Sequence, residues 1–344
     1  YTGLAGNLPI TIDDNVNVSQ ANEISALTSA AVTANISTTV LADFASMPVK
    51  ATVNAYTITI NDGVGANIDA DALQALNAKT TVDIALTNEA TLTGTLANVN
   101  IIVAETGYSN TVLDTVAVTI TDTITAAEAE TLAGTNVGTI TATIAADAAA
   151  TINTAMTQGG GGSNVAATDL LSITVTDSSV DPAILNLLDG KTGTDIDVSA
   201  VNTISGAEAA IDTLYGNTAN FVGLGNENIT VTGGAISIGD ANTIAGYTSG
   251  TITATITAGT AAALTALNGT GNAYTLDVSD GAAVDAANLL ALNGKTTVPV
   301  DLQLITAAGT ALNGNYAELK ALFAAAASGD YTGLAGNLPI TIDD

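Results

Sequence analysis

Seven short segments of the chain alternate apolar side chains with polar ones, and most of them end in aspartate. They read ITIDD at 10–14, ITIND at 58–62, VTITD at 118–122, ITVTD at 173–177, ITVTG at 229–233, LDVSD at 276–280 and ITIDD at 340–344. A period of two residues with many β-branched side chains is typical of a strand that buries one face. We therefore predict strands near 10–13, 58–61, 118–121, 173–176, 229–232 and 275–278.

A short helix is predicted after each of these strands. Three helices share an N-cap aspartate followed by two leucines spaced i, i+3, which form one apolar stripe. These residues are Asp69, Leu73 and Leu76; Asp181, Leu185 and Leu188, with Pro182 at the first helical position; and Asp285, Leu289 and Leu292. Thr125 with Glu128, and Ser237 with Asp240, have the spacing of a capping box. Gly190 and Gly294 are expected to end their helices with a positive φ.

A second strand is expected after each helix, at 81–85, 139–144, 195–198, 251–256 and 297–302. A strand that returns through a helix after about 22 residues forms a parallel, right-handed βαβ crossover. The sequence thus predicts an α/β tandem-repeat solenoid with parallel β-strands and short intervening helices. The alternative is a row of small, separate β-rich domains, which modules of this size would barely stabilise without disulfides or metal.

The motif spacings show that the chain is an array. They are 48, 60, 55, 56, 47 and 64 residues, and taken in pairs they become 108, 111 and 111. We predict three superrepeats: 1–117 with modules from 10 and 58, 118–228 with modules from 118 and 173, and 229–339 with modules from 229 and 276. Residues 331–344 repeat residues 1–14 letter for letter, so they begin the next 330-residue period. We therefore expect the array to continue head to tail.

The composition removes whole classes of function. The chain has 33 acidic residues, five lysines and a net charge of −28, without arginine, histidine or cysteine. This charge disfavours binding to nucleic acid or anionic lipid, and the missing residue types leave few catalytic groups. With 47% hydrophobic and 11% charged residues, the chain is too apolar to be disordered. No apolar run approaches the ~20 residues of a membrane span, so we expect neither an enzyme nor membrane insertion by this segment.

Oxygen-bearing side chains gather at the ends of the predicted strands, and they allow two interpretations. The residues are Asp13, Asp14, Asn61, Asp62, Asp122, Asp177 and Asp280. Calcium prefers such carboxylate and amide ligands, which makes these residues a candidate calcium site and calcium the only candidate cofactor. Aspartate and asparagine also cap helices and form turns without metal. Lys79, Lys191 and Lys295 share one aligned position past a helix, where they either compensate the helix dipole or pair with an acid of a neighbouring module.

Two strings resemble the repeats of giant, acidic, repetitive cell-surface proteins of marine cyanobacteria. They are LLALNGKTT at 289–297 and YGNTANFVGLGNENITVTG at 215–233. The resemblance implies an exported, extracellular or cell-surface protein involved in motility or attachment, with no catalytic residues. We therefore expect a non-enzymatic structural array of a bacterial surface layer or extracellular filament, which associates with itself head to tail. The alternatives are an adhesin or calcium-dependent module that binds glycans or other surface proteins, and an ice-binding protein.

Overall fold

The computed structural model describes residues 6–87, 89–104, 107–109, 116–135, 137–157, 162–334 and 338–343. They form an α/β structure in which the strand pairings are parallel. Contacts divide the chain into two compact units, and each is described by itself. The first comprises Tyr1–Ala146, Ala150–Thr174 and Asp189–Asp195, and the second Asp147–Ala149, Val175–Leu188 and Ile196–Asp344.

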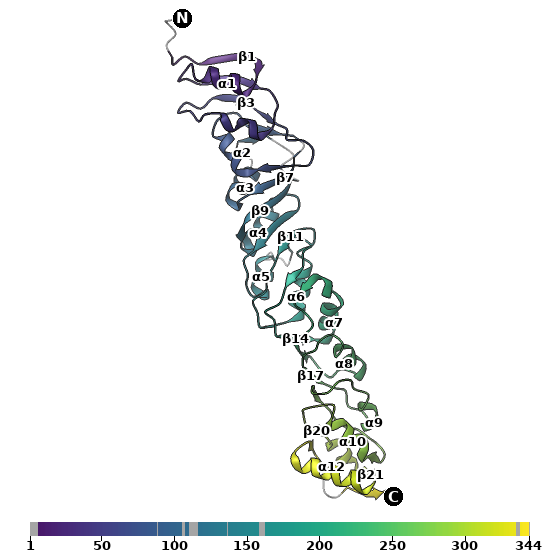
Figure 1. Cartoon of the computed structure of the whole chain (residues 1–344). Helices are drawn as coiled ribbons and strands as arrows, with labels where there is room; N and C mark the ends of the chain where they lie inside the picture. Colours follow the sequence, from purple (N-terminus) through teal and green to yellow (C-terminus); the bar gives the residue numbers. More distant parts are fainter. Residues whose placement is uncertain are drawn as a thin grey trace. The chain divides into compact units, whose positions relative to one another are not determined.

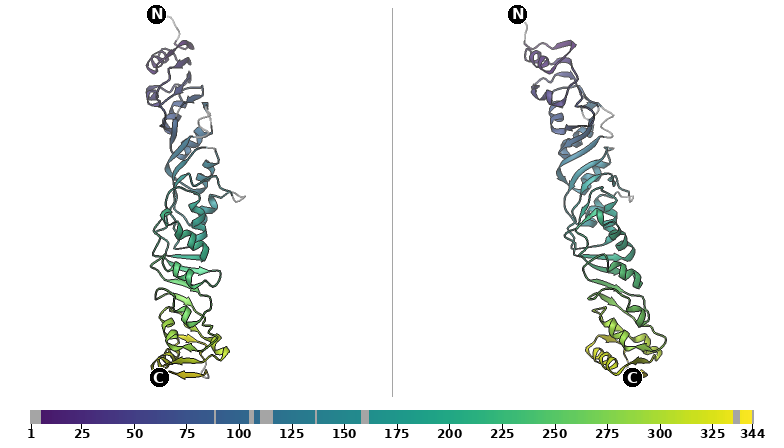
Figure 2. Two further views of the ribbon diagram at one scale, coloured as in Figure 1. Left: turned by 90° about the vertical axis from the view of Figure 1, so that its right-hand side faces the viewer. Right: turned by 45° about the vertical axis from the view of Figure 1, so that its right-hand side comes forward.

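In the first unit, strands and short helices follow one another in chain order (Figures 1 and 2). Its strands are β1 (Ile10–Val16), β2 (Val32–Ile36), β3 (Ala55–Thr57), β4 (Thr59–Ile60), β5 (Ala66–Asp69), β6 (Ile84–Leu86), β7 (Glu89–Gly94), β8 (Tyr108–Ser109), β9 (Ala117–Ile124), β10 (Ile140–Ile144) and β11 (Leu170–Ser172). Its helices are α1 (Val18–Ser25), the 3₁₀ helix η1 (Leu41–Ser46), α2 (Ala70–Asn77), α3 (Leu96–Val103), α4 (Ala126–Ala133) and most of α5 (Ala149–Ala155). They form sheets in the orders β1-β2-β3, β4-β6-β8 and β5-β7-β9-β10-β11.

The second unit is built in the same way. Its strands are β12 (Ser179–Val180), β13 (Ile196–Asp197), β14 (Thr203–Ala207), β15 (Phe221–Val222), β16 (Asn228–Thr232), β17 (Ile252–Thr255), β18 (Ala273–Thr275), β19 (Val284–Asp285), β20 (Val300–Asp301), β21 (Leu312–Gly314), β22 (Tyr331–Thr332) and β23 (Ile340–Ile342). Its helices are α6 (Pro182–Asp189), α7 (Glu208–Gly216), η3 (Thr218–Asn220), α8 (Ile238–Ile244), α9 (Ala261–Leu264), α10 (Ala286–Asn293), α11 (Gln303–Ala308) and α12 (Tyr316–Ser328). The sheet orders are β12-β14-β16-β17-β18, β13-β15, β19-β21-β23 and β20-β22.

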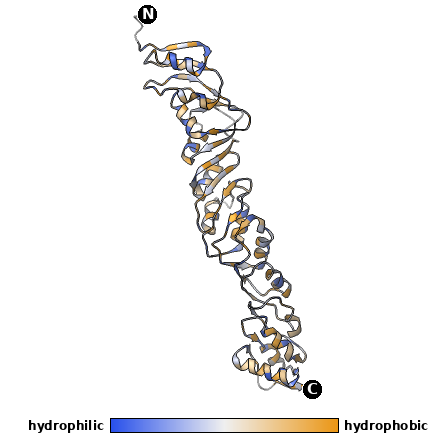
Figure 3. Ribbon diagram, in the orientation of Figure 1, coloured by the Kyte–Doolittle hydropathy of each residue, from blue (hydrophilic) through white to orange (hydrophobic). Residues whose placement is uncertain are grey.

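The modules that start at 10, 118 and 229 confirm the predicted strand–helix–strand unit. In each of them the motif strand is followed by a helix, and the next strand pairs with the first in parallel: β1-α1-β2, β9-α4-β10 and β16-α8-β17. The capping boxes predicted at Thr125 and Ser237 are present. Apolar positions of the motif are buried, with 0% and 5% of Val118 and Ile120 exposed, and Figure 3 shows apolar and polar residues interleaved along the ribbon of each unit.

The other three modules differ from the prediction. A further short strand, β5, β12 or β19, lies between the motif and the predicted helix. The strand expected at 173–176 is wrong: β11 ends at Ser172, and Val175 forms only an isolated bridge to Asp147. The strand expected at 275–278 is wrong too, because β18 ends at Thr275, and Asp277 and Val278 form only isolated bridges. The motif residues Ile173 and Val175 are nonetheless buried, with 1% and 0% exposed. The alternation predicts which side chains face the core, whereas the length of a strand depends on its partner.

The segments between modules hold helices that the sequence pattern did not predict. They are η1, α3, α5, α7, η3, α9, α11 and α12. The N-caps Asp69 and Asp285 and the leucine stripes are confirmed. The positive φ expected at Gly190 and Gly294 is wrong, because neither residue has one. At Gly294 φ is −76°, and its N–H bonds back to Leu292 O in a tightened last turn. The superrepeat boundaries at 117/118 and 228/229 remain a prediction.

Candidate functional site

Four of the strand-end aspartates cap a helix that lies earlier in the chain. We use the word rung for a strand together with the helix that follows it. A rung ends where the next strand, paired in parallel with the first, begins. In each case a carboxylate accepts the N–H of the first residue of the helix in the preceding rung. The bonds run from Leu41 N to Asp62 (3.0 Å), from Leu96 N to Asp122 (2.9 Å), from Ala149 N to Asp177 (2.6 Å) and from Ala261 N to Asp280 (2.7 Å). The first helical N–H groups have no partner inside their own helix, so these bonds satisfy a group that would otherwise be unpaired.

The parallel register explains why the same motif position reaches the same helical position. Thr39 lies beside Ile60, Asp147 beside Val175, and Gly259 beside Val278. Two residues further along each of these paired segments, the last residue of the motif therefore lies beside the first residue of the neighbouring helix. We call these bonds the inter-rung caps.

The fifth motif of the series provides a natural comparison. It ends in Gly233 instead of aspartate, and its register places Thr232 beside Ala207. The helix that begins at Glu208 has Ala207 as its N-cap and receives no side-chain capping bond. Where the aspartate is missing, the side-chain cap is therefore missing too.

The remaining candidates of this group behave differently. Asp13 and Asp14 lie exposed in β1. Asn61 Oδ1 accepts the N–H of Gly63 (3.1 Å), which closes a turn. Among the described residues, no three acidic side chains come together in a way that could hold a metal ion. The capping interpretation thus accounts for Asp62, Asp122, Asp177 and Asp280, and calcium binding by these residues remains a prediction.

Other helices carry their cap in their own rung. Capping boxes begin α1, α4, α8 and α12, at Asn17, Thr125, Ser237 and Asn315. Asp69, Asp181 and Asp285 accept N–H groups of α2, α6 and α10. Because Thr125 donates its backbone N–H and its hydroxyl to Glu128, the pKa of that carboxyl is lowered.

Comparison with known proteins does not assign a family to this arrangement. No protein-family model, curated protein or solved structure matches the chain. The resemblance to cyanobacterial surface repeats therefore remains a prediction from the sequence strings. Among the described residues, no helix is both long enough and apolar enough to cross a bilayer.

Two of the three aligned lysines, Lys79 and Lys191, bind the C-terminal end of a helix in an earlier rung. Lys79 Nζ donates to the carbonyls of Phe44 (3.1 Å) and Ala45 (3.4 Å), which lie at the end of η1. Lys191 Nζ donates to Met156 O (2.7 Å), just beyond α5. A cation at a helix C-terminus is stabilised by the helix dipole, and here that helix belongs to an earlier rung. Burial lowers the pKa of both ammonium groups, and for Lys191 nearby Glu130 opposes this shift.

The threonine that follows each aligned lysine uses its hydroxyl to bond to backbone groups of a strand, as a neighbouring strand would. Thr80, Thr192 and Thr296 are buried, and their hydroxyls donate to Tyr56 O (2.8 Å), Leu171 O (2.8 Å) and Tyr274 O (2.6 Å) of the preceding rung. Thr80 and Thr192 also accept the N–H of Tyr56 (3.0 Å) and of Leu171 (3.0 Å). One hydroxyl thus satisfies both backbone groups of a strand residue, which would be costly to leave unpaired in the core.

A second buried polar position recurs at the start of three strands. Asn54, Asp169 and Asn272 accept the N–H groups of Val32 (3.0 Å), Ile140 (2.8 Å) and Ile252 (3.0 Å). Sequence reasoning missed these residues and the buried threonines. A signal was present, because NAYT occurs at both 54–57 and 272–275.

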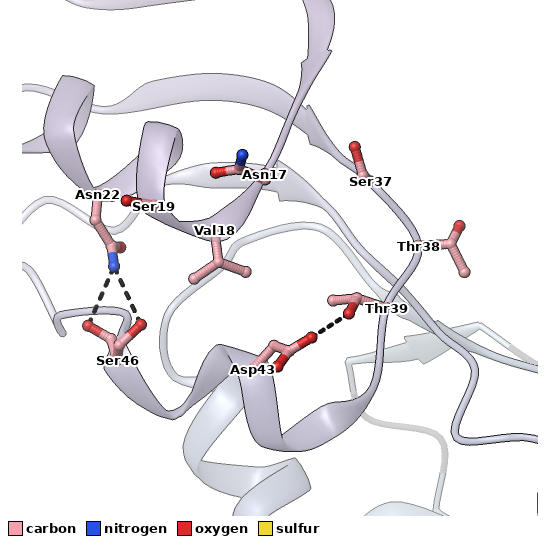
Figure 4. A pocket seen from close by; sticks show the side chains of 9 residues that line it. All are labelled: Asn17, Val18, Ser19, Asn22, Ser37, Thr38, Thr39, Asp43 and Ser46. Carbon is pink, nitrogen blue, oxygen red and sulfur yellow. Dashed lines mark hydrogen bonds between the residues drawn. The ribbon is translucent and has the colours of Figure 1, made fainter.

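An open pocket lies in the first unit between α1 and η1 (Figure 4). It has a volume of about 680 Å³, and most of its lining is hydroxyl, amide or carboxylate. The lining residues are Asn17, Val18, Ser19, Asn22, Ser37, Thr38, Thr39, Asp43 and Ser46. Asn22 Nδ2 donates to Ser46 O and Oγ (both 3.3 Å), while the Asn22 Oδ1 atom is buried without a partner. The pocket can accept a small polar molecule, and it lacks an aromatic stacking surface.

Proposed function

We propose that the chain is a structural segment of a bacterial surface layer or extracellular filament, folded as an α/β solenoid and without enzymatic activity. In this proposal it acts through length, stiffness and head-to-tail continuity. The inter-rung caps are the observation that carries the proposal. The aspartates and lysines that recur along the sequence bond to backbone groups of neighbouring rungs. They thus hold the fold together and, among the described residues, do not gather into a reactive site.

The use of lysine supports the same proposal. Three of the five lysines, Lys50, Lys79 and Lys191, donate to backbone carbonyls 20 to 35 residues earlier in the chain. The excess of carboxylates therefore remains on a surface that repels other anions. That surface suits an exposed extracellular array, which we propose as the localisation.

The solenoid can be tested with a chain that carries residues 1–330 twice in tandem. Small-angle X-ray scattering would compare it with the single chain. A continuous solenoid should roughly double its longest dimension while the radius of its cross-section stays constant. A row of separate domains on flexible linkers would bend at each junction, and the scattering would lose its rod-like region. That result would contradict the proposal.

The pocket between α1 and η1 favours one second candidate, an adhesin that binds a glycan. Its hydroxyl, amide and carboxylate lining matches the hydrogen-bonding groups of a sugar. We would measure binding of the chain to a glycan array and repeat it with Asn22→Ala. Saturable binding that this variant loses, while Asn242→Ala at the equivalent helix position of α8 retains it, would support an adhesin. Equal binding by both variants would contradict it.

A further inference from the structure

Two tyrosines of the second unit stack on each other. Tyr215 lies near the end of α7 and Tyr247 lies just beyond α8, and the two helices contact each other. The ring centroids are 4.9 Å apart, and the ring planes differ by 3°. This arrangement is typical of an offset stack of aromatic rings. Tyr215 is buried, whereas Tyr247 is half-buried and can be reached from solvent.

Both hydroxyls of the stacked pair donate to a carboxylate. Tyr215 OH donates to Glu227 Oε2 (2.8 Å), and Tyr247 OH donates to Asp212 Oδ1 (3.1 Å). Burial, and after it the bond to the carboxylate, raises the pKa of both phenols, so both are protonated at neutral pH. The hydroxyls of three other buried tyrosines donate to backbone carbonyls instead: Tyr56, Tyr108 and Tyr331. A carboxylate can take the proton of an oxidised phenol, whereas a backbone carbonyl is far too weak a base.

The surroundings of Glu227 favour the arrival of a proton. Its side chain is 1% exposed, and its Oε2 atom also accepts the N–H of Gly225 (2.9 Å). Its Oε1 atom is buried without a hydrogen-bond partner among the described residues. A buried charge and an unpaired buried oxygen both cost free energy. Transfer of the Tyr215 proton to Glu227 would remove that charge at the moment when the phenol is oxidised.

We propose that Tyr215 and Tyr247 are a site of oxidative cross-linking, at which a one-electron oxidant such as a haem peroxidase with hydrogen peroxide joins the two rings as dityrosine. Each ring gives one electron to the oxidant and its hydroxyl proton to its own carboxylate. The two phenoxyl radicals, held face to face, form one C–C bond between ring carbons next to the hydroxyl-bearing carbons. Those two carbons then lose their hydrogens as protons, and the oxygens regain theirs from Glu227 and Asp212. Hydrogen peroxide takes up the two electrons and two protons and becomes two molecules of water.

The composition of the chain directs oxidation to tyrosine. The chain has no cysteine, tryptophan or histidine, and its two methionines, Met47 and Met156, are buried. The oxidant needs to reach only Tyr247, because the stacked ring of Tyr215 can pass its electron to its neighbour. The new bond ties the end of α7 to the segment after α8 in a chain that cannot form disulfides. Cross-linking requires only the fold of the second unit, so its failure would leave the proposed array untouched.

The direct test treats the dilute chain with hydrogen peroxide and a haem peroxidase. Cleavage before aspartate places the two tyrosines in separate peptides, 212–239 and 240–276. Mass spectrometry should find these peptides linked, with a mass two hydrogens below their sum, and fragmentation should place the bond between Tyr215 and Tyr247. The yield should not depend on chain concentration, since both rings belong to one molecule. A chain that stays unlinked while the same peroxidase couples free tyrosine, or links that form only at other tyrosines, would overturn the proposal.

Two variants test the ring and the carboxylate, with hydrogen exchange to verify that each is folded. Tyr247→Phe removes a hydroxyl at a half-buried position and should abolish the link, whereas Tyr331→Phe removes a buried hydroxyl of the same unit and should leave the link unchanged. Proton transfer to a positioned base contributes roughly 10²- to 10⁴-fold to a rate, so Asp212→Asn should slow linkage about tenfold or more. Asp195→Asn removes an exposed carboxylate and should not slow it. An unchanged rate in Asp212→Asn, or a link that persists in Tyr247→Phe, would overturn the proposal.

Discussion

Replacing Asp62 with alanine tests whether an inter-rung cap stabilises the neighbouring rung. Asp62 accepts the N–H of Leu41 through both carboxylate oxygens, at 3.0 and 3.3 Å. The N-cap of η1 itself is Val40, which offers no side-chain bond. Leu41 is buried, so Asp62→Ala leaves the first N–H of η1 without its side-chain acceptor.

The expected loss of stability in η1 follows from measured effects of removing a helix cap. Replacing an N-cap aspartate by alanine costs about 1 kcal/mol, with a range of roughly 0.5 to 2. Because about 1.4 kcal/mol is a factor of ten in an equilibrium constant, local opening of η1 should become about fivefold more frequent. Asp62→Asn keeps an acceptor oxygen and should cost less than Asp62→Ala.

Hydrogen exchange read by mass spectrometry is the suitable assay, because a chain of two compact units need not unfold in one step and local opening is what the cap controls. Amides in 41–46 should lose protection, while amides of α4 and α12 should not change. Asp83→Ala removes one exposed negative charge elsewhere in the same unit and serves as the control for net charge. If 41–46 keeps full protection in Asp62→Ala, or if Asp83→Ala reduces it equally, the capping argument is refuted.

Three further predictions follow from other parts of the structure. Thr80→Val should destabilise the first unit by about 1–3 kcal/mol, since it leaves Tyr56 N and O unpaired in the core; exchange at β3 would measure this, with exposed Thr81→Val as the neutral control. The pKa of Glu128 is lowered from 4.5 by its bonds from Thr125. Its stabilisation of α4 is therefore present above pH 4.5 and declines as the pH falls through the lower pKa of the folded state. In Glu128→Gln, the protection factors of the α4 amides, which correct for the pH dependence of exchange itself, should not change with pH in this range. At fixed ionic strength, millimolar calcium and a chelator should give equal melting temperatures, because the four capping carboxylates already accept backbone N–H groups; an increase with calcium that Asp177→Ala abolishes would establish the calcium site.

The sequence alone could predict those parts of the fold whose determinants are local. The strand–helix–strand unit from 118 onwards is such a part, because strand alternation and the capping box of Thr125 and Glu128 lie within a few residues of each other. The leucine stripe of α10 is another, since Leu289 and Leu292 face one side of a single helix. In both cases the partner that decides the structure is one helical turn away or less.

The inter-rung contacts could not be predicted in this way. Asp122 and Leu96 are 26 residues apart, and only the strand register places the carboxylate beside the N–H of α3. The return helices were missed for a related reason. α9 is only four residues long, and its N-terminus is held by its own Thr260 and by Asp280 of the next motif. Half of its capping therefore depends on a residue that local patterns do not connect to it.

Side chains bond to backbone groups of both neighbouring rungs. Asp62, Lys79 and Thr80 bond to backbone groups of an earlier rung. In the other direction, Asn242 Nδ2 donates to Ala266 O while its Oδ1 accepts the N–H of Asn268, and the buried Glu130 accepts the N–H groups of Asn164 and Val165. Removing either neighbour would therefore leave buried groups unpaired, which is costly in a protein core. These bonds join residues 21 to 35 positions apart, so a pattern that extends over one helical turn does not connect the residues that form them.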